Sequence, residues 1–315
     1  MKKTEQQNND SATKDMAFMN ATGKLEYTLT NDYMFHVVMQ RNEKVLRGLI
    51  GSLLGISQDE IIKVELKNPI IPGQAVGDKE IILDLMIILN GDRFLNIEMQ
   101  VNRREDWVER SLVYLCRNFD NLSKGDIYSD VMPCLHIGII DFDLFDGMSE
   151  FYSRYRIKNE QDGRIYTDKF GINVLNLRCI GNATEDDKKN ELDVWARLFK
   201  AKTWEEIKMI ANQYDFAKEA ANSIYAVSAD EAIRLQCEAR ERYERDWASS
   251  YKTGFRAGVQ QEKDNTDREK KRADEAEADL KTVEANLKTA EADLKTAEAR
   301  IGELEEELRK LKASN

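Results

Sequence analysis

The chain has 315 residues, of which 42% are hydrophobic and 33% are charged, so it can bury a substantial core and suits two domains plus an appendage. Its four cysteines are far apart and form no CxxC pair, and it has only two histidines, which argues against a disulfide framework, a zinc site and His-based catalysis. The net charge is −11, and the first 263 residues carry −7 of it, which argues against a wholly basic nucleic-acid binder but allows local phosphate-binding clusters.

The N-terminal segment is polar and has no apolar signal core. Residues 1–24 show no hydrophobic period and predict a disordered tail. The longest apolar run, residues 81–89, is too short to span a bilayer and contains Asp84. We therefore expect a cytoplasmic protein that does not enter a membrane.

Two short helices are predicted before the first strand. Asn31 or Thr30 can cap the first helix, and Asn42 can cap a second, which Gly55 would end. Residues 60–67 alternate between apolar and polar side chains, as a strand does, and residues 69–73 open a loop.

Residues 82–102 predict a β-hairpin that turns at Asn90 and Gly91. A loop of odd length centred there pairs residues whose numbers sum to an even value, so Asp84 would lie opposite Glu98 or one diagonal step away. Gln100 would share their face, because side chains alternate along a strand. A two-residue loop would shift the register by one and separate the two acids.

Two carboxylates a few Å apart in strands of Ile, Leu and Met are costly without a cation or another partner. Hard oxygen ligands favour Mg²⁺ or Mn²⁺, which usually keep several waters and bind substrate phosphate. The alternative is an exposed sheet face, where Asp84 and Glu98 are solvated and opposed by nearby arginines.

A predicted helix, a buried strand and a second hairpin follow. The helix spans residues 105–122, the strand 135–142 and the hairpin arms 151–158 and 164–175, and helical segments continue from 185 to about 262. The first of these helices should have near one face Trp107, Leu112, Leu115, Cys116 and Phe119. Four arginines after the acidic hairpin could bind phosphate or be solvated helix-face residues: Arg103, Arg104, Arg110 and Arg117.

From residue 273 the chain shows a seven-residue repeat that predicts a C-terminal coiled coil. The a positions are Leu280, Leu287, Leu294, Ile301 and Leu308, and the d positions are Val283, Ala290, Ala297, Leu304 and Leu311. Alanine at two d positions buries little, and in a parallel dimer Asp279 would face Glu284. We expect a homo-oligomer formed through residues 273–311, although the stripe could instead fold back or bind another helix.

The order α, β, β, β, α, β over residues 31–142, with an acid on the second strand and ExQ on the third, resembles the PD-(D/E)XK nuclease core. More narrowly, the chain resembles the Rpn family of recombination-promoting nucleases, which are also described as putative transposases. The resemblance covers roughly residues 28–262 and is carried in family order by TNDYMF (30–35), the Asp84 strand, NIEMQ (96–100), ERSLVY (109–114) and the run from KGDIY to MPCLHIGI (124–139).

The resemblance implies an α/β protein with a PD-(D/E)XK restriction-endonuclease-like core over residues 25–182 and a helical domain over 183–262. The heptad repeat adds the expected coiled coil over 263–315. It also implies an Mg²⁺- or Mn²⁺-dependent endonuclease that hydrolyses DNA phosphodiester bonds and is linked to recombination or mobile elements. The rival interpretation is a catalytically weak DNA-binding or scaffold protein that assembles through its coiled coil, which the acidic net charge favours.

In the nuclease interpretation, Asp84 and Glu98 ligate the metal and the Met99 backbone carbonyl completes the protein part of its shell. Gln100 stands where the wider superfamily has lysine, and its amide can orient water but carries no positive charge. Asp32 is a further candidate metal ligand, or simply a first-turn acid stabilised by the helix dipole. The candidate DNA contacts are Arg103, Arg104 and Arg110.

Overall fold

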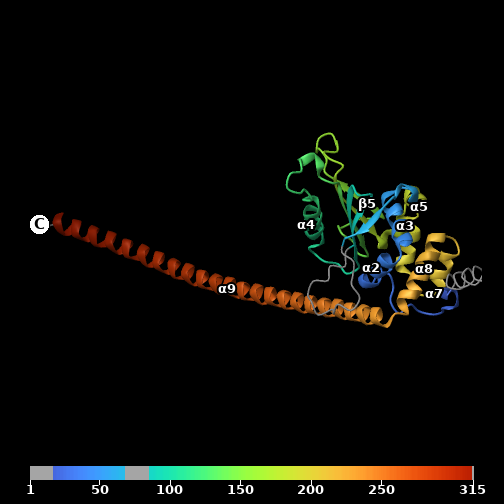
Figure 1. Ribbon diagram of the computed structural model, residues 1–315. Coiled ribbons are helices and arrows are strands. Elements are labelled where there is room, and N and C mark those ends of the chain that lie inside the picture. Colours follow the sequence, from blue (N-terminus) through green and yellow to red (C-terminus); the bar gives the residue numbers. More distant parts are fainter. Residues whose placement is uncertain (1–16, 68–84, 314–315) are drawn as a thin grey trace, which may run out of the picture. The chain divides into compact units, whose positions relative to one another are not determined.

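The computed structural model describes residues 17–67 and 85–313 and is a mixed α/β structure with a six-stranded sheet (Figure 1). The strands lie in the order β1-β2-β3-β4-β6-β5. β3, β4 and β6 are parallel to one another, and the other neighbouring pairs are antiparallel. The strand bounds are β1 Val64–Leu66, β2 Leu85–Leu89, β3 Arg93–Gln100, β4 Cys134–Ile140, β5 Tyr152–Arg156 and β6 Phe170–Asn176.

The helices of the described chain stand mainly before and after the sheet in sequence. The α-helices are α2 Asp32–Arg41, α3 Glu43–Leu54, α4 Trp107–Phe119, α5 Glu185–Lys189, α6 Leu192–Lys200, α7 Trp204–Ala211, α8 Asp215–Ser228 and α9 Glu231–Ala313. Short 3₁₀ turns are η1 Ala17–Asn20, η2 Gln58–Glu60, η3 Tyr128–Asp130 and η4 Leu177–Asn182.

The predicted caps of the first two helices are confirmed. The Asn31 side chain accepts from the Met34 amide at the start of α2, and Asn42 accepts from the amides of residues 44 and 45 at the start of α3. Gly55 ends α3 with φ +69°, a left-handed conformation that glycine adopts without steric cost.

The hairpin of β2 and β3 has the predicted odd loop. Leu89 pairs with Arg93, so three residues form the turn, and Asn90 and Gly91 have φ values of 54° and 80°. The Asn90 side chain also ties this turn to the segment before β1, because its oxygen accepts from the amides of Ile62 and Lys63. The paired residues along the hairpin therefore have numbers with an even sum, as predicted.

Alternation along β3 separates an apolar face from a polar one. Leu95, Ile97 and Met99 join the core that α2, α3 and α6–α8 form on one side of the sheet. Asn96, Glu98 and Gln100 point to the other side, where α4 packs on β3, β4 and β6. The candidate site thus lies between the sheet and α4.

The predicted face of α4 is confirmed at Trp107 and Leu115 and wrong at two other positions. Trp107, Ser111 and Leu115 are buried, whereas Leu112 and Cys116 are exposed. The prediction assigned the larger apolar residues to the buried face, but the sheet beneath α4 is partly polar, so a serine fits there and donates to the Val108 carbonyl.

The predicted disordered tail is wrong for its last residues. Phe18 is buried in the main core, and Leu25 donates a backbone hydrogen bond to Lys202. Gly23 also bonds to the start of α7, through the Glu205 carboxylate and the Trp204 amide, so the segment 17–24 is held to the fold although most of its side chains are exposed. A single buried aromatic residue in this stretch gave no periodic signal. Residues 1–16 and the predicted loop at 69–73 lie outside the described residues.

The chain divides into two compact units, one ending at Arg245 and one beginning at Asp246. The first unit holds the sheet and α2–α8, whose buried side chains form one main core. The second is helical throughout its described length, as the C-terminal part of α9. The domain boundaries expected after residues 182 and 262 stay predictions. Among the described helices, none is both long enough and apolar enough to cross a membrane.

Candidate functional site

Glu98 lies on β3 beneath α4 and is almost completely buried, with 4% of its surface exposed. Its carboxylate forms an ion pair through Oε1 with the Arg110 guanidinium of α4. Its other oxygen, Oε2, lies 3.6 Å from His136 Nε2 and has no hydrogen bond to a described residue. The alternative of a solvated acid on an exposed sheet face is therefore wrong for Glu98, because this carboxylate is buried. The nearby arginine of that alternative is present, as Arg110.

His136 reaches the same side of the sheet from β4 and is fully buried. Burial, together with the nearby Arg110 charge, lowers the pKa of His136 to about 3, so the ring is neutral at neutral pH. Asn96, its direct partner on β3, lies 3.1 Å from His136 Nδ1 through Nδ2. Glu98 therefore has one charged neighbour and one neutral neighbour.

Gln100 is held at both ends of its amide. Arg110 Nη2 donates to Gln100 Oε1 at 2.9 Å, and Gln100 Nε2 donates to the Asn102 carbonyl at 2.9 Å. Arg110 also lies 5.8 Å from the centre of the Tyr114 ring, at the next turn of α4. One guanidinium thus joins the acid and the amide of the ExQ motif.

Gly138 lets α4 approach the sheet at this site. It pairs with Glu98 across β3 and β4, and a Cβ atom there would overlap the ring of Trp107 at the start of α4. The indole stands 5.8 Å from the His136 ring, measured between centroids. Glycine at 138 therefore allows the close packing that carries Arg110 over Glu98.

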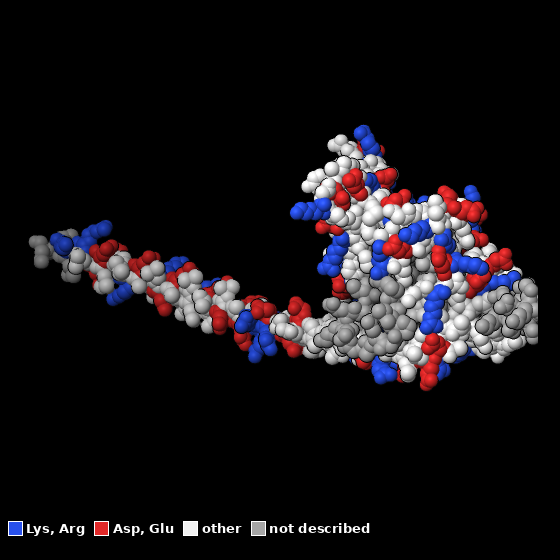
Figure 2. All heavy atoms as spheres, in the orientation of Figure 1, with Lys and Arg blue, Asp and Glu red and all other residues white. Residues whose placement is uncertain are grey.

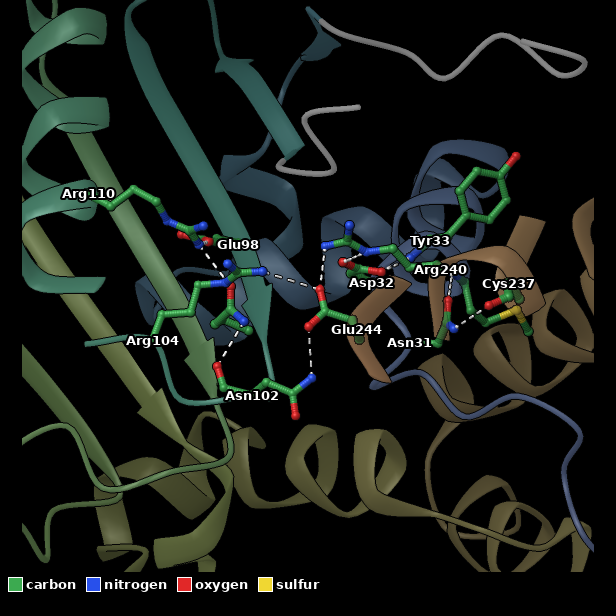
Figure 3. A network of polar contacts seen from close by, with 12 residues as sticks. Asn31, Asp32, Tyr33, Glu98, Asn102, Arg104, Arg110, Cys237, Arg240 and Glu244 are labelled. Carbon is green, nitrogen blue, oxygen red and sulfur yellow. Dashed lines mark hydrogen bonds and ion pairs between the residues drawn. The ribbon is translucent and has the colours of Figure 1, made fainter. Parts of the chain in front are cut away.

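A second polar cluster lies beside the C-terminal end of β3 (Figure 3). Asp32, the first residue of α2, binds Arg240 Nε of α9 through Oδ2 at 2.6 Å and accepts from the Tyr33 amide through Oδ1. Burial raises the pKa of the Asp32 carboxyl, and the Arg240 charge opposes that rise. Arg240 Nη2 also contacts Glu244 Oε1 at 2.9 Å, one turn along α9.

Glu244 extends this cluster to the segment after β3. Its Oε2 accepts from Asn102 Nδ2 at 2.9 Å, and its Oε1 lies 3.4 Å from Arg104 Nη2. Through Asn102, whose carbonyl accepts from Gln100, the start of α9 is connected to the candidate site. Figure 3 shows Glu244 between Arg240 on one side and Asn102 and Arg104 on the other.

A cavity of about 240 Å³ opens beside this cluster, within the first unit. Its lining comes from the segment before α2, the end of β3 and the start of α9, and includes Asp32, Gln100, Asn102, Arg240 and Glu244. Gln100 is therefore the residue of the ExQ motif that connects the buried carboxylate to an open, polar space.

The structure brings together only part of the predicted set. Glu98, Gln100 and Arg110 are in contact, whereas Asp32 and Arg104 belong to the neighbouring cluster. Arg103 is exposed, and the Met99 side chain faces the opposite core. Asp84 lies outside the described residues; the first described residue after it, Leu85, pairs with Ile97, which directly precedes Glu98.

The described residues offer a metal ion one suitable ligand but not a complete set of ligands. A buried carboxylate oxygen without a hydrogen bond, Glu98 Oε2, is a suitable hard ligand. Among residues 17–67 and 85–313, no three His, Cys, Asp or Glu side chains cluster as a metal site. A complete shell would therefore need Asp84, a backbone carbonyl or water in addition to Glu98.

Sequence reasoning missed five residues of these clusters: Asn96, His136, Asn102, Arg240 and Glu244. Asn96 and His136 carried a usable signal, because a polar side chain inside a buried strand must find a partner. Arg240 and Glu244 stand four residues apart on a helix, a spacing that indicates an ion pair but not its contacts with residues more than 100 positions away.

Comparison with protein-family models places residues 29–254 in the PD-(D/E)XK nuclease family transposases. Comparison with curated proteins and with solved structures gave no match. The match spans most of the chain and includes β3, α4 and the first turns of α9, and it confirms the family expected from the five motifs between residues 30 and 139. This protein therefore belongs to the PD-(D/E)XK nuclease family transposases, a membership that indicates a nuclease-like role.

Proposed function

We propose that this protein is a metal-dependent DNA endonuclease that hydrolyses phosphodiester bonds in recombination or mobile-element processes. The observation that carries the proposal is the buried Glu98 of β3, whose Oε2 has no hydrogen bond to a described residue, in a chain of this family. A carboxylate left this way has the capacity to accept a cation.

The proposal takes residues 31–142 as the nuclease core. The observed order of α2 and α3, then β1, β2, β3, α4 and β4, supports this assignment. The parallel pairing of β3 with β4 supports it further, because it places Glu98 and His136 side by side under one helix.

Asp84 and Glu98 would hold Mg²⁺ or Mn²⁺, with the Met99 carbonyl as a further ligand. When bound, the ion would activate a water molecule and offset charge on the scissile phosphate. Gln100, held by Arg110 and the Asn102 carbonyl, would orient that water through its amide. Arg110 would keep the Glu98 carboxylate and the Gln100 amide in fixed relative positions.

Asp32 as a ligand of a second ion stays a prediction, and it would require Asp32 to exchange Arg240 for a metal. DNA contacts also stay predictions. Arg103 is the exposed candidate, whereas Arg104 and Arg110 already contact Glu244 and Glu98. We include Arg103 as a phosphate contact in the proposal, because its side chain is exposed and it directly follows the cavity-lining Asn102 in the sequence.

A plasmid-nicking assay with Mg²⁺, with Mn²⁺ and with EDTA tests the proposal. Glu98→Gln and Asp84→Asn keep side-chain size but remove a charged ligand, so each should abolish metal-dependent cleavage, a loss of at least about 10³. Glu109→Gln, an exposed acid on α4, is the matched control and should cleave at the wild-type rate.

The rival function is a DNA-binding or scaffold protein that cleaves weakly. The Arg110–Glu98 ion pair favours it, because a guanidinium already offsets the buried carboxylate charge. DNA binding without cleavage in any metal would support this rival. Cleavage by Glu98→Gln at the wild-type rate, with EDTA inhibiting both proteins, would place the metal elsewhere.

Self-association through residues 273–311 is the remaining part of the proposed function. It is supported by the continuous helical structure of this segment in α9 and by its heptad repeat.

A further inference from the structure

The heptad seam of α9 is exposed along its described length. Large apolar side chains at its a and d positions are about half exposed, for example Leu287 at 58%, Ile301 at 56% and Leu304 at 48%. The spacing is regular from Leu280 onward, and such a stripe on a charged helix is the pattern by which helices pair. A partner helix would bury it.

The seam is not equally apolar along its length. Two d positions in its first part are alanine, Ala290 and Ala297. Its last part has full-sized residues at every a and d position, namely Ile301, Leu304, Leu308 and Leu311. Burial of apolar area per heptad should therefore be greatest over residues 301–311.

The flanking charges change along the helix in the same way. In a parallel, in-register pair, each g residue faces the e residue five positions later on the partner helix. In the first part of the seam this rule places Asp279 opposite Glu284 and Asp293 opposite Glu298, and these like charges repel each other.

In the last two heptads the same rule places unlike charges opposite each other, where they attract. Arg300 at g faces Glu305 at e, and Glu307 at g faces Lys312 at e. Figure 2 shows Lys and Arg lying among Asp and Glu along this helix. Residue size and charge thus independently indicate the same segment.

An antiparallel pair fits these charges poorly. There e positions face e positions, and those of the first four heptads are all glutamate: Glu284, Glu291, Glu298 and Glu305. Within a parallel coil, Ile at a with Leu at d, as at Ile301 and Leu304, favours two strands.

We propose that the partner of this seam is a second copy of the chain, in parallel and in register, with residues 300–312 as the main pairing segment. This inference rests on the proposed self-association and not on DNA cleavage. Within one chain Arg300 contacts Glu303 at 2.8 Å, but both side chains are more than 60% exposed, so Arg300 can exchange this contact for Glu305 of the partner helix at little cost.

The direct test uses the full chain with a cysteine at the seam. In a parallel, in-register pair, the two copies of Leu304→Cys face each other and should form a disulfide-linked dimer under mild oxidation. Glu306→Cys lies on the outer face two residues away and should not. The wild type gives the background of the native cysteines, of which Cys116 is exposed.

Charge exchange tests the pairing rule separately. Arg300→Glu and Glu305→Arg each place like charges at both symmetric contacts, so each should raise the dissociation constant of the homodimer about tenfold. A mixture of the two variants restores unlike charges at both contacts, and should form a heterodimer with about the wild-type dissociation constant.

The outcomes are distinguishable by sedimentation and non-reducing gels. Even a weakly associating dimer should be detectable at about 100 μM. A protein that stays monomeric at all concentrations up to this value would overturn the self-association itself. A dimer in which the Leu304→Cys chains form no disulfide would overturn the parallel register. A dimer whose affinity neither charge variant changes would overturn the role of residues 300–312. None of these results depends on whether the protein cleaves DNA.

Discussion

At Glu98 the two carboxylate oxygens have different surroundings. One is paired with the Arg110 charge, and the other stands 3.6 Å from a neutral imidazole that adds no positive charge. The buried acid thus depends on a single cation within the described residues. Glu98 Oε2, which has no hydrogen bond to a described residue, is therefore the atom at which a second cation would bind.

The stability of the protein should decrease in mild acid because of His136. The pKa of this histidine is about 3 in the folded chain and near the usual 6.5 when unfolded, so the unfolded state binds more protons below pH 6.5. The contribution of neutral His136 to the free energy of unfolding is fully present above pH 6.5. It is lost as the pH falls toward 3, by up to about 1.4 kcal/mol per pH unit.

Urea unfolding at pH 7.5, 6 and 5 measures this loss. His136→Gln keeps a polar partner for Asn96 but cannot titrate, so its free energy of unfolding should depend less steeply on pH. The same pH slope in both proteins would show that other groups account for the acid sensitivity.

Gln100→Met should slow cleavage by roughly 10², the scale for losing a positioned catalytic group. Methionine keeps the length of the side chain but makes neither the contact with Arg110 nor that with the Asn102 carbonyl. Metal affinity should stay within about tenfold of wild type, since no ligand is removed. Wild-type cleavage by Gln100→Met would remove this amide from the mechanism.

Among the elements, the start of α9 has an unusual position. Arg240 and Glu244 join α2 to the segment after β3, while Ile233 and Cys237 of the same helix lie in the main core. These turns therefore belong structurally to the first unit, which ends at Arg245.

Glu244→Ala should lower the free energy of unfolding by about 1–3 kcal/mol, because it leaves Arg240 and Asn102 without their shared partner. Glu238→Ala is the matched control on the same helix. Its ion pair with Arg242 is more than half exposed, so the change should stay within about 0.5 kcal/mol.

Chemical denaturation of the two variants gives this comparison, and hydrogen exchange of the amides of residues 102–104 should be faster only in Glu244→Ala. Equal stability of both variants would mean that the cluster around Glu244 contributes no more than a surface pair.

Local signals predicted the elements well and their contacts poorly. The caps at Asn31, Asn42 and Gly55 and the turn at Asn90 depend on neighbouring backbone groups, so the sequence contains them in full. The buried face of α4 and the Asp32–Arg240 pair depend on what the rest of the chain places opposite, which hydrophobic spacing cannot express.

For the candidate site the same division holds. Glu98 and Gln100 were predictable because both lie on one face of a strand whose register the turn determines. That Arg110 would bind both, and that His136 would stand beside them, required the parallel pairing of β3 with β4 and the placement of α4.

At the scale of the whole molecule, the first unit should fold without the heptads. Its core is complete by Cys237, and the boundary between the compact units lies at residues 245 and 246. Deleting residues 264–315 should leave thermal unfolding of the first unit within a few degrees of wild type and preserve nicking, while sedimentation shows a monomer. An insoluble truncated protein would contradict this division.

If the protein cleaves DNA and pairs as proposed, the uneven seam of α9 has a consequence for the products of cleavage. A parallel pair tied mainly at residues 300–312 would join two chains so that both first units precede the same end of the coil, and would leave the weaker heptads before it free to separate. Two Glu98 sites would then meet one duplex in a single encounter. Supercoiled plasmid should become linear with little nicked circle accumulating, whereas the Leu304→Asp chain, unable to pair, should release nicked circles first and produce linear DNA only by later, independent cuts.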